Sequence, residues 1–233
     1  MVNIDTVYQR VLAIANKEQR GHITPLEFNL LANQAQLVVF EQYFYDRHQT
    51  ARVPGSKINH SDVDAMLDEK ISIFEIRNQV LTGGILPINL YRLDSLTYNA
   101  NECTEVSAKE WAYIQHSSLL QPTTLRPIYI RGAGGVAVHG DGNLQIGIFP
   151  DPINVLCNFI QQPERVEWGY DVIGEKALFN GAPGRTTHFQ HHPSEETELV
   201  MRILELAGVI IEDPNVTQYA NQKIKEQVQQ EKS

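Results

Sequence analysis

The spacing of apolar residues changes along the chain, and this change limits its fold more than any other feature. Up to about residue 80 the spacing is three to four, typical of amphipathic helices, and Ile4, Val7, Val11 and Ile14 give one clear stripe. From Gly83 it becomes two, in short runs rich in Val, Ile, Tyr and Phe between glycine, proline and asparagine, which is typical of strands. The last forty residues return to the helical spacing.

These patterns predict an α+β fold, with a helical bundle from the N- and C-terminal segments and a central antiparallel β-sheet or sandwich. Residues 1–80 form the expected N-terminal helical region, and residues 81–192 a β-rich region with one short helix. The C-terminal helices, 193–233, are expected to pack with the N-terminal helical region or with a neighbouring subunit. Asp141-Gly142 is expected to form a hairpin turn.

Several helix boundaries have sequence signals. Thr24 with Glu27, and Ser107 with Glu110, have the spacing of a capping box. Ser61 or Asp62 is expected to start a helix that runs to Val80, and Gly208 is expected to stop a later one. We expect three apolar residues of the 61–80 helix to face inward: Met66, Ile73 and Phe74.

Charge and composition exclude several classes of function. The chain has 233 residues, with 28 acidic and 19 basic side chains, a formal net charge of -9, which disfavours broad binding to nucleic acid. No apolar run is long enough to cross a bilayer, and the N-terminus lacks the pattern of a secretory signal. Cys103 and Cys157 lie far apart and are expected to be reduced, buried thiols.

Three histidines in five residues, His188, His191 and His192, raise the question of a metal site. With Glu195 or Glu196 they could supply zinc ligands, which would suit a metal-dependent hydrolase. However, the H-E-x-x-H order is missing and no cysteine pair is near. A helix entrance explains more of the residues, because Pro193 suits the first turn, Ser194 is a capping type, and the glutamates suit the positive end of the helix dipole.

Other candidate sites have plainer explanations. The glycine-rich stretch Arg131 to Asn143 is followed by a strand pattern rather than a helix, so a sheet loop is favoured over a phosphate-binding loop. There is no G-x-S-x-G elbow. Four acids fall in the first turns of a predicted helix, where acids are common: Asp62, Asp64, Asp68 and Glu69. We therefore expect no enzyme activity, no cofactor and no metal.

The helix that starts near Thr24 is apolar on several faces, which suggests that another subunit covers part of it. Aromatic side chains with a polar tip are also enriched at interfaces. The last 20 residues or so carry one narrow apolar stripe, which we expect to dock on a neighbour. The expected interface residues are Phe40, Tyr43, Phe44, Tyr45, Tyr170, Val216, Ala220, Ile224 and Val228.

Three stretches together resemble virion structural proteins of tailed bacteriophages, especially the crAss-like group with short tails. They are "NIDTVYQRVLAIANKEQRGHITPLEFNLLANQAQLVVFEQYFYD", "PERVEWGYDV" and "HHPSEETELVMRILELAGVIIEDPNVTQYANQK". The resemblance covers both ends of the chain, and the middle only through the strand with Trp168 and Tyr170.

This resemblance implies a ring component of the neck, the head-to-tail connector under the portal protein, in the virion of a phage assembled in the bacterial cytoplasm. Such rings usually carry about twelve copies around the DNA channel. The implied partners are further copies, the portal protein, other neck and tail proteins, and the passing genome without sequence-specific binding. A capsid decoration or tail protein is the structural alternative. The β-rich insertion departs from the mostly helical adaptors of other short-tailed phages.

Overall fold

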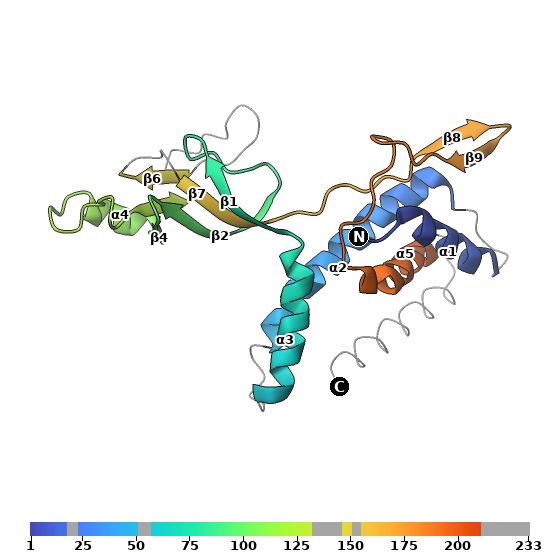
Figure 1. Cartoon of the computed structure of the whole chain (residues 1–233), viewed down its shortest axis with the longest axis horizontal. Coiled ribbons are helices and arrows are strands. Elements are labelled where there is room, and N and C mark those ends of the chain that lie inside the picture. Colours follow the sequence, from blue (N-terminus) through green and yellow to red (C-terminus); the bar gives the residue numbers. More distant parts are fainter. Residues whose placement is uncertain (18–22, 51–56, 132–145, 151–154, 211–233) are drawn as a thin grey trace. The chain divides into compact units, whose positions relative to one another are not determined.

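The computed structural model describes residues 1–17, 23–50, 57–131, 146–150 and 155–210. The chain divides into two compact units. The helical unit contains residues 1–73 together with the chain from residue 163 onward, and the sheet unit contains residues 74–162 (Figure 1). The predicted α+β fold is confirmed. The unit boundaries follow residues 73 and 162, whereas we predicted them at 80 and 192.

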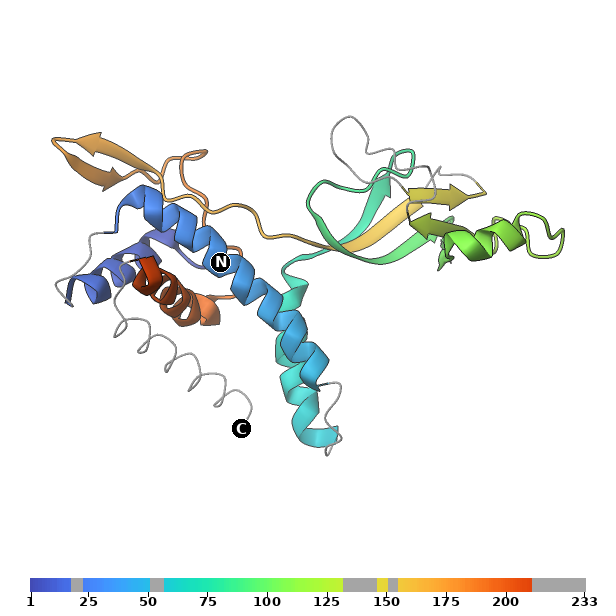
Figure 2. The ribbon, with the colours of Figure 1, turned by 180° about the vertical axis from the view of Figure 1, so that it is seen from behind.

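The helical unit contains α1 (Ile4–Lys17), α2 (Pro25–Thr50), α3 (Lys57–Ser72) and α5 (Glu196–Ile210). One turn of 3-10 helix, η1 (Pro193–Glu195), precedes α5, and a hairpin is formed by β8 (Tyr170–Ile173) and β9 (Lys176–Phe179). Helix α5 packs against α1 and α2, and α3 packs against α2; Figure 2 shows the same neighbours from behind. The two ends of the sequence thus build one core.

The predicted apolar stripes form this core. Helix α1 buries Ile4, Val7 and Val11 of its predicted stripe, whereas Ile14 is half-buried. The capping box of Thr24 and Glu27 starts α2. The residues of the predicted stripe on α2 are all at most 5% exposed: Phe28, Leu31, Ala35 and Val39. The predicted face of α5 is buried equally well and consists of Leu199, Val200, Ile203, Leu204 and Ala207. The sequence-based interpretation of these faces is confirmed.

Amide side chains of α2 bind the backbone of an extended segment far along the chain. Asn33 donates to the carbonyl of Val166 at 2.8 Å and accepts from its N–H at 3.0 Å. Asn29 accepts from the N–H of Trp168 at 2.8 Å. These bonds satisfy backbone groups of Val166 and Trp168, whereas Glu167 between them pairs with Thr187. They give the two asparagines of α2 a structural role.

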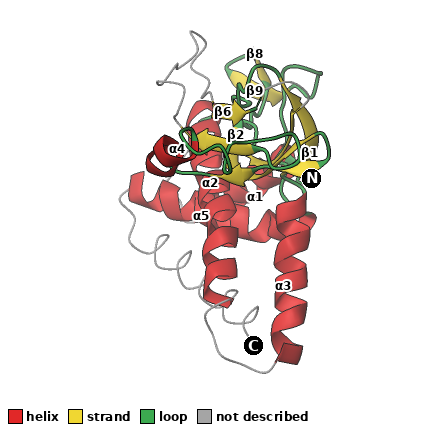
Figure 3. Ribbon diagram, turned by 90° about the vertical axis from the view of Figure 1, so that its left-hand side faces the viewer, coloured by secondary structure: helices red, strands yellow, loops and turns green. Residues whose placement is uncertain are grey.

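Eight elements lie in the described part of the sheet unit, and Figure 3 colours strands and helices differently. They are β1 (Glu75–Leu81), β2 (Leu90–Tyr98), β3 (Asn101–Glu102), β4 (Thr104–Glu105), α4 (Ala108–Ile114), β5 (Ile128–Arg131), β6 (Ile146–Phe149) and β7 (Val155–Gln161). One sheet has the order β1-β7-β2-β3 and the other the order β4-β5-β6. All pairs are antiparallel except β4 with β5.

Both sheets contribute to one apolar core. Leu96 of β2, Phe159 of β7, Tyr129 of β5 and Ile148 of β6 belong to the same buried cluster. Alternate residues of β7 point inward, so that Val155, Cys157 and Phe159 are all at most 2% exposed. The two-residue period seen in the sequence therefore builds a small sandwich, as predicted.

The predicted helix at 61–80 is wrong at both ends. Helix α3 begins at Lys57 and ends at Ser72, and β1 starts at Glu75. Met66 is 56% exposed and Ile73 is 39% exposed, contrary to our expectation, whereas Phe74 is buried as expected. Residues 75–81 become a strand because β7 offers them antiparallel hydrogen bonds, and a partner about 80 residues away does not show in a local sequence pattern.

Other boundaries differ or lie outside the described residues. Helix α5 continues through Gly208 to Ile210 instead of stopping at the glycine, because the packing of α5 on α1 and α2 outweighs the weak helix propensity of one residue. The capping box of Ser107 and Glu110 starts α4, as predicted. The Asp141-Gly142 turn and the predicted C-terminal helix after Asp213 lie outside the described residues.

Candidate interaction surfaces

The three histidines have three separate structural roles. His188 accepts a hydrogen bond at Nδ1 from the backbone N–H of Ile4, at the start of α1, at 3.3 Å. His192 caps η1 by accepting from the N–H of Ser194, and Pro193 follows at the first position of the turn. His191 is fully buried. The helix-entrance interpretation is confirmed, although His192 rather than Ser194 is the capping residue. No group of three or more His, Cys, Asp or Glu among the described residues could hold a metal ion.

A buried ion pair joins α3 to η1, the turn that precedes α5. The Nζ of Lys70 lies 2.7 Å from an Oε of Glu195, and these residues are only 8% and 1% exposed. Burial raises the pKa of the Glu195 carboxyl, but its hydrogen bonds with Lys70, Glu198 and Ser194 and the Lys70 charge outweigh this and leave the pKa below its ordinary value. Sequence reasoning assigned Glu195 only to the helix dipole, because nothing local pointed to Lys70.

His191 belongs to the same enclosed cluster. Its ring centroid lies 6.0 Å from that of Tyr43, whose ring also lies 5.9 Å from the Nζ of Lys70. Burial lowers the pKa of His191 to about 4, against the opposing effect of the Glu195 charge. The imidazole is therefore neutral at pH 7. Because these side chains are almost inaccessible to solvent, the cluster can stabilise the fold but offers no access to a substrate.

The two thiols and the described acids of α3 show neither an activated nucleophile nor a pair of carboxylates. Cys103 and Cys157 are buried and form no disulfide, as expected, and burial raises the pKa of each thiol to about 11. Both are therefore protonated at neutral pH. Asp68 makes a surface ion pair with Arg47 at 3.3 Å. Asp64 and Glu69 are exposed, and the side chain of Asp62 lies outside what the structure describes, as does the stretch 132–143.

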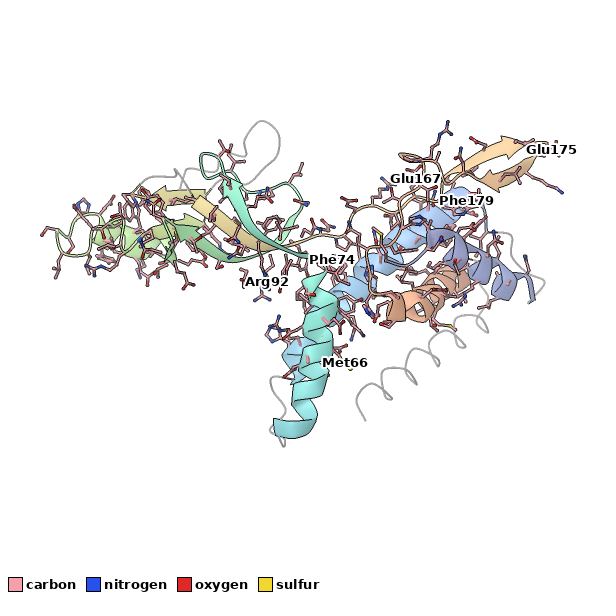
Figure 4. The ribbon with its side chains drawn as sticks, in the orientation of Figure 1. Met66, Phe74, Arg92, Glu167, Glu175 and Phe179 are labelled. Atoms are coloured by element: carbon pink, nitrogen blue, oxygen red, sulfur yellow. The ribbon has the colours of Figure 1, made fainter. Side chains whose placement is uncertain are left out.

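The β8–β9 hairpin presents apolar side chains to solvent on both faces. Cross-strand partners share a face, so Val172 lies opposite Ala177 on one face and Asp171 opposite Leu178 on the other. Val172 and Ile173 are 67% and 64% exposed, and Leu178 is 50% exposed. Figure 4 labels Glu175 at the tip and Phe179 at the base. An isolated two-stranded hairpin is marginally stable in water, so these side chains are suited to a partner.

Local chemistry forms this hairpin and anchors its base. Gly174 and Glu175 both have positive φ, 56° and 65°, as a two-residue type I′ turn requires. At the base, the rings of Tyr170 and Phe179 lie 5.7 and 5.8 Å from the buried ring of Trp168. The indole of Trp168 donates to Asp5 at 2.9 Å. The base of the hairpin is therefore fixed to the core by Trp168, and its tip extends away from the core.

Two further stretches expose large apolar side chains. On α2, Leu26 and Leu30 are 66% and 57% exposed, on the side opposite the buried stripe. In the sheet unit, the segment from α4 to β5 exposes four residues by more than half: Tyr113, Leu119, Leu120 and Leu125. Clusters of exposed apolar side chains of this kind are typical of interaction surfaces.

The predicted interface residues divide into three groups. Phe40 and Tyr43 are 1% and 3% exposed, so those two predictions are wrong: both side chains are already buried within the chain. Tyr45 is 58% exposed, and Phe44 and Tyr170 are half-buried, which leaves these three accessible to a partner. The remaining four lie outside the described residues: Val216, Ala220, Ile224 and Val228.

No helix among the described residues is both long and apolar enough to cross a membrane. A comparison with known protein families found none that matches the chain, and no curated protein matches it closely enough to count as a relative.

Proposed function

We propose that the chain is a non-enzymatic structural protein of a bacteriophage virion, a ring component of the portal and neck connector around the DNA channel. The observation that carries this proposal is the β8–β9 hairpin, which exposes apolar side chains on both faces. A single copy leaves Val172, Ile173 and Leu178 in water, whereas a ring contact would cover them.

Three other features support the same role. The ends of the chain resemble neck proteins of crAss-like short-tailed phages, and these ends together form the helical unit. The sheet unit has its own exposed apolar segment, which suits a second protein of the neck or the portal protein. The net charge of -9 would let the genome pass without sticking, because acidic side chains repel phosphate.

Native mass measurement tests the proposal directly. The full chain is measured alone, and then with the portal protein and candidate neck proteins of a crAss-like phage. We expect closed homo-oligomers, of about twelve copies as the resemblance to neck proteins implies, alone or on the portal protein. A chain that stays monomeric in every mixture would overturn the proposal, as would a strongly basic lumen in an assembled ring.

Variants of the β8–β9 hairpin test whether this hairpin forms the contact between copies. Val172→Asp and Ile173→Asp each place a charge on a different face of the hairpin, and we expect at least one to reduce assembly more than tenfold. Glu175→Gln, at the tip between the same strands, is the matched control and should assemble normally. Unchanged fluorescence of buried Trp168 shows that each variant is folded. Full assembly of both aspartate variants would exclude the hairpin as a ring contact.

A further inference from the structure

Helix α2 has a second apolar face, opposite the one buried in the core. Leu30, Leu37 and Phe44 are seven residues apart, so they follow one line along the helix, and Leu26 lies one turn before Leu30 on the same side. Leu26 and Leu30 are exposed, and Leu37 and Phe44 are half-buried. We call these four residues the outer seam of α2.

The C-terminal segment of the chain has a matching apolar stripe. Its sequence places Val216, Ala220, Ile224 and Val228 four residues apart. If helical, this stripe spans about 18 Å from first to last residue, and the outer seam from Leu26 to Phe44 spans about 27 Å at the same rise per residue. The stripe is therefore short enough to lie along the seam over its whole length.

Charges beside the two stripes are also complementary. Glu41 is exposed and lies four residues after Leu37, next to the seam. Lys223 comes seven residues after Val216, so helical spacing puts it on the side of the C-terminal stripe. A lysine beside one apolar stripe and a glutamate beside the other favour one register of docking over the others.

We propose that the outer seam of α2 is the docking site for residues 213–230 of a neighbouring copy of the same chain. This inference rests on the proposed assembly into a ring. Helix α5 packs on the buried face of α2, so the chain at Ile210 lies on the opposite side of α2 from the seam. A contact between the C-terminal segment of one copy and the seam of the next joins two different surfaces, and such contacts form a closed ring when the rotation between copies closes on itself.

Disulfide trapping in the full-length chain tests the docking. The buried thiols of Cys103 and Cys157 are shielded, so introduced cysteines at the surface are the reactive ones. We mix separately purified Leu30→Cys and Ile224→Cys proteins and oxidise them gently. A covalent dimer containing one chain of each kind is expected. Met66→Cys, at an exposed position of α3, replaces Leu30→Cys as the matched control and should give at least tenfold less mixed dimer.

A chain that carries both Leu30→Cys and Ile224→Cys decides which copy provides the segment. Docking on a neighbour produces a ladder of covalent oligomers. A cross-linked monomer, with no dimer in the mixing experiment, would overturn the proposal, because the segment would then dock on its own copy. Absence of both products would overturn it too.

Charge exchange tests the register and separates this inference from the proposed function. Glu41→Lys or Lys223→Glu should each lower the yield of mixed dimer about tenfold, and combining them across the contact should restore it. Equal yields from all variants would contradict the register. If native mass measurement shows rings but no cross-link forms between positions 30 and 224, the docking proposal is wrong and the proposed function is unaffected. A persistent monomer would contradict both proposals.

Discussion

The helical unit and the sheet unit hold distant parts of the chain together by different interactions. Among the described residues, the buried polar and charged side chains all belong to the helical unit: Gln36, Lys70, His191, Glu195 and Glu198. The buried cluster of the sheet unit contains apolar side chains, two tyrosines and the two thiols. The continuous sheet unit forms its core from alternating apolar residues. The helical unit, made from both ends of the sequence, adds directional polar contacts that help to specify which distant segments pack together.

The two tryptophans allow each unit to be followed separately. The chain has only two, and Trp111 belongs to the sheet unit and Trp168 to the helical unit. Trp111→Phe leaves fluorescence that reports on the helical unit, and Trp168→Phe leaves fluorescence that reports on the sheet unit. Urea unfolding in these two backgrounds measures the free energy of unfolding of each unit separately.

The largest effect is expected from Lys70→Met. This change leaves the buried Glu195 carboxylate without the ammonium group 2.7 Å away, and loss of one partner of a buried pair costs about 3 to 5 kcal/mol. The free energy of unfolding should fall for the helical unit and remain unchanged for the sheet unit. Adding Glu195→Gln should recover most of the loss. A single variant that costs less than about 1 kcal/mol would show that the pair contributes little.

Leu96→Ala should destabilise the sheet unit and leave the helical unit unchanged. Leu96 is fully buried in the core shared by both sheets, and removing its side chain should cost about 2 to 5 kcal/mol. The Trp111 signal should report this loss and the Trp168 signal should not. Equal losses in both signals would mean that the units unfold together. Leu119→Ala, at a position 80% exposed, is the control.

Acid should weaken the helical unit through His191. Its pKa falls from 6.5 to about 4 on folding, so between these values the unfolded chain binds a proton that the folded chain does not. Stability is therefore complete above pH 6.5 and declines toward pH 4, by up to about 3 kcal/mol. His191→Gln should flatten this decline. Folding lowers the pKa of the Glu195 carboxyl, so the stability that this group contributes is lost mainly at a pH below the range in which His191 acts.

The smallest effects are expected at the two capping boxes, one in each unit. Thr24→Ala removes the cap of α2, and Ser107→Ala removes that of α4. Each should cost about 1 kcal/mol, visible only in the signal of its own unit. Ser117→Ala, in the turn after α4, is the control for the second variant. Identical losses in both units from either change would contradict the separation of the two cores.

Local signals in the sequence predicted much of the fold. The capping boxes were found because their residues are three apart and bind one another directly. The faces of α1, α2 and α5 were found because helical periodicity reports which side is buried. The start of α5 was predicted from Pro193 and the glutamates, but the ion pair was not, since Lys70 lies 125 residues before Glu195.

The aromatic residues of α2 show the same limit at the candidate interface. Their spacing indicated that α2 is apolar on several faces, but could not tell which of these faces its own chain covers. Phe40 and Tyr43 are buried within their own chain, whereas Leu26 and Leu30 remain exposed. The sequence did not distinguish these two pairs of residues. The packing of α3, α5 and the segment with His191 on α2 separates the two sets.

By itself, the sequence determined where most helices begin, which strands alternate, and that the mixture is α+β, because these depend on neighbours within a few residues. The tertiary structure decided that residues 75–81 are a strand, that Asn33 holds Val166, and that both chain ends share one core. Those outcomes depend on contacts between residues about 80 or more positions apart, whose free energy no local pattern contains.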